Sequence, residues 1–264
     1  MGLLFQYNSL QFYHSHRASY PMSSPRFFCD AKLGPGALLQ LPENAARHAA
    51  RVLRLKAGDQ VTLFNGDGHD YRAELLRVER EDVSVKIIEF TAAERESPLR
   101  VTLAQAIASG DRMDFTLQKS VELGVAAIQP LAAERSVVKL NGERADKRRQ
   151  HWQNVVISAC EQSGRAVVPP VAAPMPLLNW LGAPESFALK LMLSPTAELT
   201  LHDLPRPAGA ICLLIGCEGG FAPPEVAAAE ARGFIPVRLG ARILRTETAA
   251  MAALAAMQTL WGDF

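Results

Sequence analysis

The first part of the chain, residues 25–90, alternates short apolar runs with turn residues. Runs of four to eight residues are typical of strands, and here they cover 26–29, 37–40, 60–64, 71–78 and 83–89. The turn Asn65-Gly66-Asp67-Gly68 favours a hairpin, because both glycines can adopt positive φ. Together with one helix over 42–55, this pattern predicts a small β-barrel.

The second part of the chain has a different rhythm. Residues 91–98 are polar and end in proline, as expected for a linker. Strands and helices then alternate. The expected strands are 101–107, 127–131, 189–193, 211–216 and 235–239, and the expected helices are 111–123, 143–164, 224–232 and 246–261. This alternation predicts a parallel α/β sheet that is covered on both faces.

Composition narrows the class of protein. The 264 residues are 48% hydrophobic and carry a net charge of +1, so any contact with nucleic acid must come from local basic patches. No apolar run reaches membrane-spanning length, and the four cysteines lack zinc-site spacing. We therefore expect no membrane or metal partner, reduced thiols and a cytoplasmic protein. Residues 1–24 have no clear period and predict a flexible extension, with Met22 as a hypothetical initiator.

A glycine-rich turn follows the strand predicted over 211–216. It reads Gly216-Cys217-Glu218-Gly219-Gly220-Phe221 and precedes a helix. Open α/β sheets bind ligands at the carboxyl ends of their strands, and glycines allow close approach of the backbone. The spacing matches neither the dinucleotide nor the P-loop pattern. From the residues alone, a ligand loop and a tight strand–helix connection remain equally open.

A second loop follows the strand that ends at Leu239. It carries Arg242 and Arg245 and leads into a helix with Thr246 as a reasonable N-cap. Glu247 suits the positive end of the helix dipole. Two arginines at this edge indicate either anion or nucleobase recognition or surface salt bridges.

These two segments, LLIGCEGGF and LGARILRTETAAMAAL, closely resemble the C-terminal signature of the RsmE-type 16S rRNA (uracil-N3) methyltransferases of the SPOUT superfamily. Further matching segments are spread in order along the chain, from about residue 25 to the end. They are RHAARVLRL (47–55), FNGDG (64–68), DRMDFTLQKSVELGV (111–125), PLAAERSVV (130–138) and ACEQSGR (159–165).

The resemblance implies a more specific fold and function than the periodicity of the sequence predicts. The fold is an α/β SPOUT-type parallel sheet with a C-terminal trefoil knot, plus an N-terminal PUA-like β-barrel. The domains would be a flexible extension (1–24), a PUA-like RNA-binding barrel (25–92) and a SPOUT methyltransferase domain (98–264). The implied cofactor is S-adenosylmethionine, and the implied partners are 16S rRNA in the small ribosomal subunit and a second copy of the chain.

The resemblance places the cofactor among three loops. The residues implied are Leu193, Ser194, Pro195, Ile215, Gly216, Glu218, Gly219, Gly220, Leu239, Gly240, Ile243 and Leu244. Two positions depart from the family, which usually has proline at the position of Cys217 and often histidine at that of Ser194. Backbone contacts to the cofactor could survive both changes.

Basic residues in the first domain predict RNA contacts. Arg47, Arg51 and Arg54 are spaced i, i+4 and i+7, which places them on one helix face, with His48 between them. We expect these four residues and Arg26 to bind RNA. A second basic cluster, Arg144, Lys147, Arg148 and Arg149, fits a solvated helix face as well as it fits RNA.

Methylation of uracil N3 requires loss of its proton, and a cation near O2 or O4 would stabilise the resulting anion. Arg245 is the first candidate for that cation and Arg165 the second, reaching across a dimer interface. Glu247, Glu218 or Glu161 would orient these arginines or accept the proton. The competing functions are a SPOUT methyltransferase with another RNA target and a non-catalytic RNA-binding protein of ribosome assembly.

Overall fold

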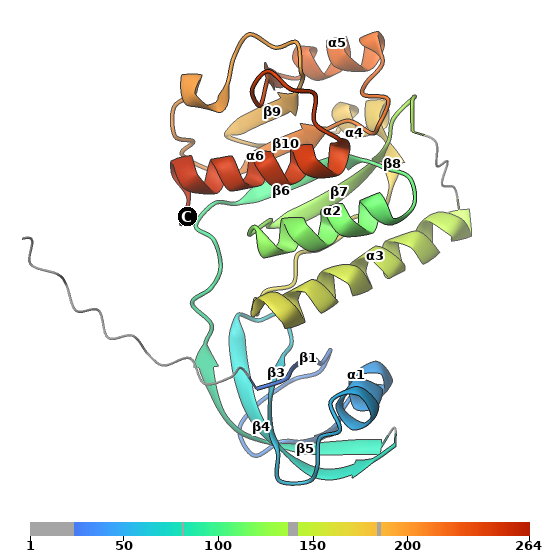
Figure 1. Ribbon diagram of the computed structural model, residues 1–264, viewed down its shortest axis with the longest axis vertical. Coiled ribbons are helices and arrows are strands. Elements are labelled where there is room, and N and C mark those ends of the chain that lie inside the picture. Colours follow the sequence, from blue (N-terminus) through green and yellow to red (C-terminus); the bar gives the residue numbers. More distant parts are fainter. Residues whose placement is uncertain (1–23, 81, 137–141, 184–185) are drawn as a thin grey trace, which may run out of the picture.

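The structure is a computed structural model that describes residues 24–80, 82–136, 142–183 and 186–264. The extension expected over 1–24 therefore lies outside the described residues except for Ser24, whose hydroxyl contacts that of Thr62 at 2.7 Å. The described chain forms two sheets, one from each part of the sequence (Figure 1).

The amino-terminal sheet has five strands in the order β1-β3-β4-β5-β2. They are β1 (Arg26–Phe28), β2 (Leu38–Gln40), β3 (Gln60–Phe64), β4 (His69–Glu79) and β5 (Asp82–Ala92). Only the β1–β3 pair is parallel. Tyr71, Ala73 and Leu75 alternate with exposed residues along β4 and pack into a separate apolar core. Alternation with a period of two is typical of a strand that buries one face.

The helix expected over 42–55 is shorter and less regular. It consists of α1 (Glu43–Arg47) followed by a π-helical turn, η1 (His48–Val52). Arg54 lies beyond the helix end with a φ of 54°. The prediction that Arg47, Arg51 and Arg54 share one helix face is therefore wrong, because the π-turn changes the residue spacing and the helix ends too early.

The carboxy-terminal sheet has six strands, all parallel, in the order β11-β9-β10-β6-β7-β8. Five of them match the predicted strands: β6 (Val101–Ala106), β7 (Ala127–Ala132), β9 (Leu189–Leu193), β10 (Ile211–Ile215) and β11 (Ile235–Val237). The sequence pattern missed β8 (Met175–Pro176), α4 (Leu177–Gly182) and the 3-10 turn η2 (Leu201–Asp203), which are too short to show a period.

Helices cover both faces of this sheet (Figure 1). One face carries α2 (Asp111–Glu122), α3 (Gly142–Ser163) and α6 (Thr246–Trp261), and the other carries α4 and α5 (Pro223–Ala231). Two apolar cores result, with Leu103, Leu117 and Leu254 in the first and Leu214 and Trp180 in the second. Because a helix that follows a parallel strand starts at the carboxyl end of that strand, α2, α5 and α6 all begin at one edge.

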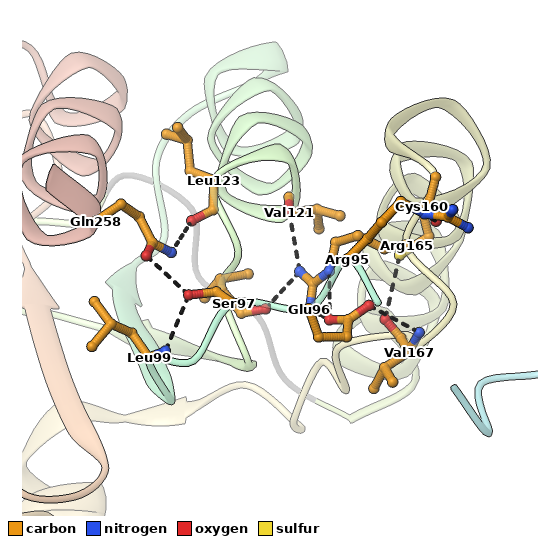
Figure 2. Close-up of polar contacts among 12 residues, drawn as sticks. Arg95, Glu96, Ser97, Leu99, Val121, Leu123, Cys160, Arg165, Val167 and Gln258 are labelled. Carbon is orange, nitrogen blue, oxygen red and sulfur yellow. Dashed lines mark hydrogen bonds and ion pairs between the residues drawn. The ribbon is translucent and has the colours of Figure 1, made fainter. Parts of the chain in front are cut away.

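The segment expected to be a linker is held in place by hydrogen bonds. Strand β5 continues to Ala92, and the residues after it bind the second domain (Figure 2). Arg95 pairs with Asp70 and donates from Nε to the carbonyl of Gly164 at 2.7 Å. The Ser97 hydroxyl donates to Gln258 of α6 at 2.9 Å. The connection thus ties the two sheets into a defined arrangement.

Arg165 and Arg26 lie at this junction between the domains. Arg165 donates from Nε and Nη2 to Glu96 at 2.9 and 2.6 Å and from Nη1 to the carbonyls of Val121 and Val125. Arg26 pairs with Asp70 at 2.8 Å and donates to the carbonyl of Arg165 in the second domain at 3.2 Å. The two arginine side chains are only 7% and 9% exposed. Both guanidinium groups therefore act in holding the domains together.

Loss of the Glu96 carboxylate should destabilise this junction. We expect Glu96→Ala to lower the free energy of unfolding by about 2 kcal/mol, because Arg165 would keep a buried charge without its partner. This value is below the usual cost of breaking a buried ion pair because Glu96 is partly exposed. Urea unfolding would measure the change. Glu94→Ala, at an exposed neighbour, is the matched control, and an equal loss in both variants would contradict the assignment.

Candidate functional site

A cavity of about 730 Å³ lies at the carboxyl ends of β9, β10 and β11. The three loops that follow these strands line it, at the edge where parallel sheets bind ligands. All twelve residues predicted to bind the cofactor are among the lining residues: Leu193, Ser194, Pro195, Ile215, Gly216, Glu218, Gly219, Gly220, Leu239, Gly240, Ile243 and Leu244. The structure thus gathers them in one place, and their role as cofactor ligands stays a prediction.

The loop after β10 is folded tightly on itself. A Cβ atom on Gly216 would lie 3.0 Å from Cα and 3.2 Å from the carbonyl carbon of Gly220. The amide of Gly220 donates to the carbonyl of Cys217 at 2.9 Å, and the Cys217 thiol donates to the carbonyl of Gly220 at 3.7 Å. Cys217 is buried, so it fills the inside of this turn where the family usually has proline.

A polar contact beneath the cavity joins three elements. Thr246, the first residue of α6, donates from its hydroxyl to the carbonyl of Gly216 at 2.6 Å. Gln105, fully buried at the end of β6, donates to that hydroxyl at 3.0 Å. The sequence analysis missed Gln105; the available signal was a glutamine inside an otherwise apolar strand, which needs a buried partner.

Glu218 is held by the start of α2. Its carboxylate accepts hydrogen bonds from the Ser109 amide and hydroxyl at 3.0 and 2.8 Å and from Arg112 at 2.8 Å. Burial alone would raise the pKa of Glu218, but these bonds and its own amide outweigh it and lower the pKa to about 2. A carboxylate this acidic is a poor proton acceptor at neutral pH.

This low pKa predicts how stability depends on pH. Because the ionised form accepts the hydrogen bonds, its contribution is complete above the ordinary pKa of 4.5 and is lost as the pH falls towards 2. We expect Glu218→Gln to be less stable than the unmodified protein at pH 7, with a difference that shrinks between pH 4.5 and 3. Urea midpoints across this range would measure it, and a difference independent of pH would contradict the prediction.

Two domain families match the chain. Residues 95–258 match the RNA methyltransferase domain family, and residues 41–88 match the RNA methyltransferase PUA domain family. The chain is 36% identical to the ribosomal RNA small subunit methyltransferase E of Buchnera aphidicola (Schizaphis graminum), covering 90% of this chain and 97% of that protein. The chain belongs to the RsmE-type RNA methyltransferases.

Solved structures agree with this family. A ribosomal RNA small subunit methyltransferase E from Neisseria gonorrhoeae, bound to S-adenosyl methionine, is 48% identical, with a TM-score of 0.85 over 91% of this chain and 99% of that one. A Legionella pneumophila protein in complex with the same cofactor is 42% identical, with a TM-score of 0.88 over 91% of this chain and 99% of that one. The two-domain fold with a PUA-type domain and a parallel sheet is therefore that of the family.

Four arginines line the cavity of this methyltransferase. Arg242 and Arg245 come from the loop before α6, and Arg112 and Arg135 come from segments that gave family matches but no predicted role. Arg135 donates to the carbonyl of Gly219 at 2.9 Å. Arg245 is exposed at the rim and forms no ion pair with any described residue. Position after a strand's carboxyl end was the signal that could have singled out Arg135.

The predicted catalytic residues do not all lie together. Arg245 and Glu247 line the methyltransferase cavity, whereas Arg165 does not. The guanidinium of Arg165 is buried and bound to Glu96 within its own chain, which does not favour the catalytic role predicted for it. One carboxylate oxygen of Glu247 is buried and has no hydrogen-bond partner among the described residues. Glu161 accepts the Phe28 amide at the domain junction and lies outside the cavity lining.

The predicted RNA-binding residues differ in how far they are exposed to solvent. His48, Arg51 and Arg54 are exposed on the PUA-type domain, and Arg47 is partly exposed and pairs with Glu43. Arg26 is nine-tenths buried in its pair with Asp70, with its guanidinium 5.0 Å from the Phe64 ring. The prediction that Arg26 contacts RNA is therefore not supported, because its charge is already engaged inside the protein.

Three further findings concern the described part of the chain only. It contains no group of three or more histidine, cysteine or acidic side chains placed to hold a metal ion. None of its helices combines the length and the apolar character needed to cross a membrane. The four cysteines are free and buried.

Proposed function

We propose that this chain transfers a methyl group from S-adenosylmethionine to N3 of a uridine in 16S rRNA, in the small ribosomal subunit. The observation that carries the proposal is the cavity at the carboxyl edge of the sheet. Its lining includes every residue that the family resemblance assigns to the cofactor. A relative that is 48% identical is described as a ribosomal RNA small subunit methyltransferase E bound to S-adenosyl methionine.

The residues present fit this cofactor. A volume of about 730 Å³ is in the range of small-molecule sites. The Gly216–Gly220 approach leaves room for backbone groups where a side chain would collide. Leu193, Leu239 and Leu244 supply apolar walls, so adenine would be held by backbone groups and apolar contact. When bound, the cofactor supplies an electrophilic methyl group on a sulfonium.

The chain's own groups would handle the uracil. N3 lies on the pairing edge and carries a proton, so the base must be unpaired or flipped out. Arg245, exposed at the rim without a described ion pair, would stabilise the negative charge that develops on the carbonyl oxygens. Glu247 is the better proton acceptor, because one of its oxygens is buried and unpartnered whereas Glu218 is held by Ser109 and Arg112.

The domain assignment follows the packing. We propose a PUA-like RNA-binding domain over 25–92 and a SPOUT methyltransferase domain over 98–264. The first has its own apolar core around Leu63 and Leu75, and the second has cores on both faces of the parallel sheet. Exposed His48, Arg51 and Arg54 would contact RNA in the first domain. A ribosomal substrate would place the enzyme in the cytoplasm.

The trefoil knot is also proposed. The family resemblance implies the knot, and two bonds place the last segment against the loops that it would thread. The Arg238 amide donates to the carbonyl of Leu199 at 2.9 Å, and Thr246 donates to Gly216 at 2.6 Å, which ties the chain between β11 and α6 to the loops after β9 and β10. An experimental structure traced through residues 193–246 would test the path.

A homodimer is proposed as well. Ile243 is 85% exposed in a loop of the cavity, and Phe115 is 43% exposed on α2. A second chain packed against the cavity loop would remove the side chain of Ile243, a lining residue, from water. Light scattering at working concentration tests this, and a strict monomer would contradict it.

The deciding experiment combines the protein with labelled S-adenosylmethionine and unmodified small subunits, with free 16S rRNA in parallel. Digestion of the RNA should release labelled 3-methyluridine. Another labelled nucleoside would replace the proposed target, and failure to bind the cofactor in calorimetry would favour a non-catalytic RNA-binding protein. Comparison of the two substrates would show whether the assembled subunit is needed.

A further inference from the structure

The amino-terminal half of α3 projects from the body of the protein. From Gly142 to His151 every residue is exposed except Ala145, which is half-buried, and Trp152 is the first buried side chain. In Figure 1 this end of α3 extends past α2 and past the sheet. His151 contacts Asp114 of α2 at 2.6 Å, and the residues before it, from Gly142 to Gln150, have no buried side chain. A helical segment without buried side chains gains little from packing, so packing within its own domain does not explain residues 142–150.

The charges on this segment are unfavourable for the isolated protein. Arg144 and Arg148 are spaced i, i+4 and lie on one face, where like charges repel. Arg144 also stands in the first turn, where the helix dipole disfavours a cation. Lys147 pairs with Glu143 at 2.6 Å, but Arg144, Arg148 and Arg149 form no ion pair with any described residue. An anionic partner would relieve this repulsion.

The segment lies at the same edge as the cavity. Helix α3 begins on the side where the strands of the parallel sheet end, as do α2 and α6 (Figure 1). Arg112, Arg135, Arg242 and Arg245 line the cavity at that edge. A nucleic acid with one base in the cavity would thus run past guanidinium groups from both places.

We propose that the face of α3 bearing Arg144 and Arg148 binds the phosphate backbone of the substrate RNA next to the target nucleotide; this rests on the proposed function. A segment from Gly142 to His151 is about 15 Å long, enough for more than one phosphate. Arginine suits phosphate because its planar fork donates two parallel hydrogen bonds. The contact sets RNA affinity and leaves the methyl-transfer step to the cavity.

The test uses the full chain with Arg144→Gln and Arg148→Gln combined. We expect the KM for small-subunit RNA to rise about tenfold or more, with kcat and cofactor affinity nearly unchanged. The slope of log affinity against log salt should fall by about 1.4, since each lost phosphate contact accounts for about 0.7 on single strands. The melting temperature should hold or rise, because the like-charge pair is gone; a purely structural role would lower it.

Arg206→Gln with Arg232→Gln removes two exposed charges elsewhere and is the matched control. Equal RNA affinity and salt slope in the α3 variant, the control and the unmodified protein would overturn the proposal. Direct RNA binding is measured apart from turnover. If the unmodified protein failed to methylate RNA, the proposed function would fall, while the binding data would still decide whether α3 contacts RNA.

Discussion

Arg245→Ala should reduce methylation of small-subunit RNA by about 10²- to 10³-fold, the usual cost of removing one donor that stabilises a developing anion. Cofactor affinity should stay within about threefold, because the cofactor is expected to contact the backbone and apolar residues of the loops. Arg245 lies at the cavity rim as the residue that precedes α6, where no described side chain neutralises it.

The pH profile distinguishes this role from a structural one. If Arg245 stabilises the uridinate, its loss raises the pKa of the bound base. The activity of the variant should therefore increase more steeply with pH than the activity of the unmodified enzyme. Single-turnover rates from pH 7 to 9.5 would show this, with Arg206→Ala as the control at an exposed arginine outside the cavity. Near-normal turnover would remove Arg245 from the mechanism.

The sequence pattern predicted the fold best for long helices with one buried face and for short strands that are mostly apolar. Helices α2 and α6 and the strands β6, β9 and β10 came within one or two residues of their bounds. It failed where tertiary contacts decide. The π-turn after Arg47 has no local signal, and β8 has only two residues, which gain their pairing from β7. The polar linker gave no sign that Arg95 and Ser97 would bind the second domain.

The sequence predicted the loops of the candidate site but missed the side chains that hold these loops in place. The loops were found through the family resemblance, which rests on motifs and their order along the sequence; the glycine spacing alone left a ligand loop and a tight connection equally open. Arg165 and Arg26 were assigned chemistry from charge alone, whereas their burial against Glu96 and Asp70 depends on how two domains meet. Gln105 and Arg112 act through partners more than a hundred residues away, which no local pattern reveals.

Gly216→Ala should weaken cofactor binding by about thirtyfold, or about 2 kcal/mol, the middle of the range for forced overpacking. The added methyl group would lie 3.0 Å from Cα and 3.2 Å from the carbonyl carbon of Gly220. These are backbone atoms that cannot rotate away, so the loop after β10 must shift. Gly216 is not among the glycines with positive φ, so the expected effect is collision and not backbone strain.

Calorimetric titration with S-adenosylmethionine would measure this loss, and thermal unfolding would report any general damage. Gly182→Ala is the matched control, since a Cβ there meets nothing within 4 Å, and it should bind the cofactor normally. If Gly216→Ala also bound normally while its loop had moved, backbone groups of that loop would not clasp the cofactor. If Gly216→Ala bound the cofactor weakly and kept its melting temperature, the collision would affect the loop without destabilising the fold. The close approach of Gly216 and Gly220 would then be a requirement of cofactor binding.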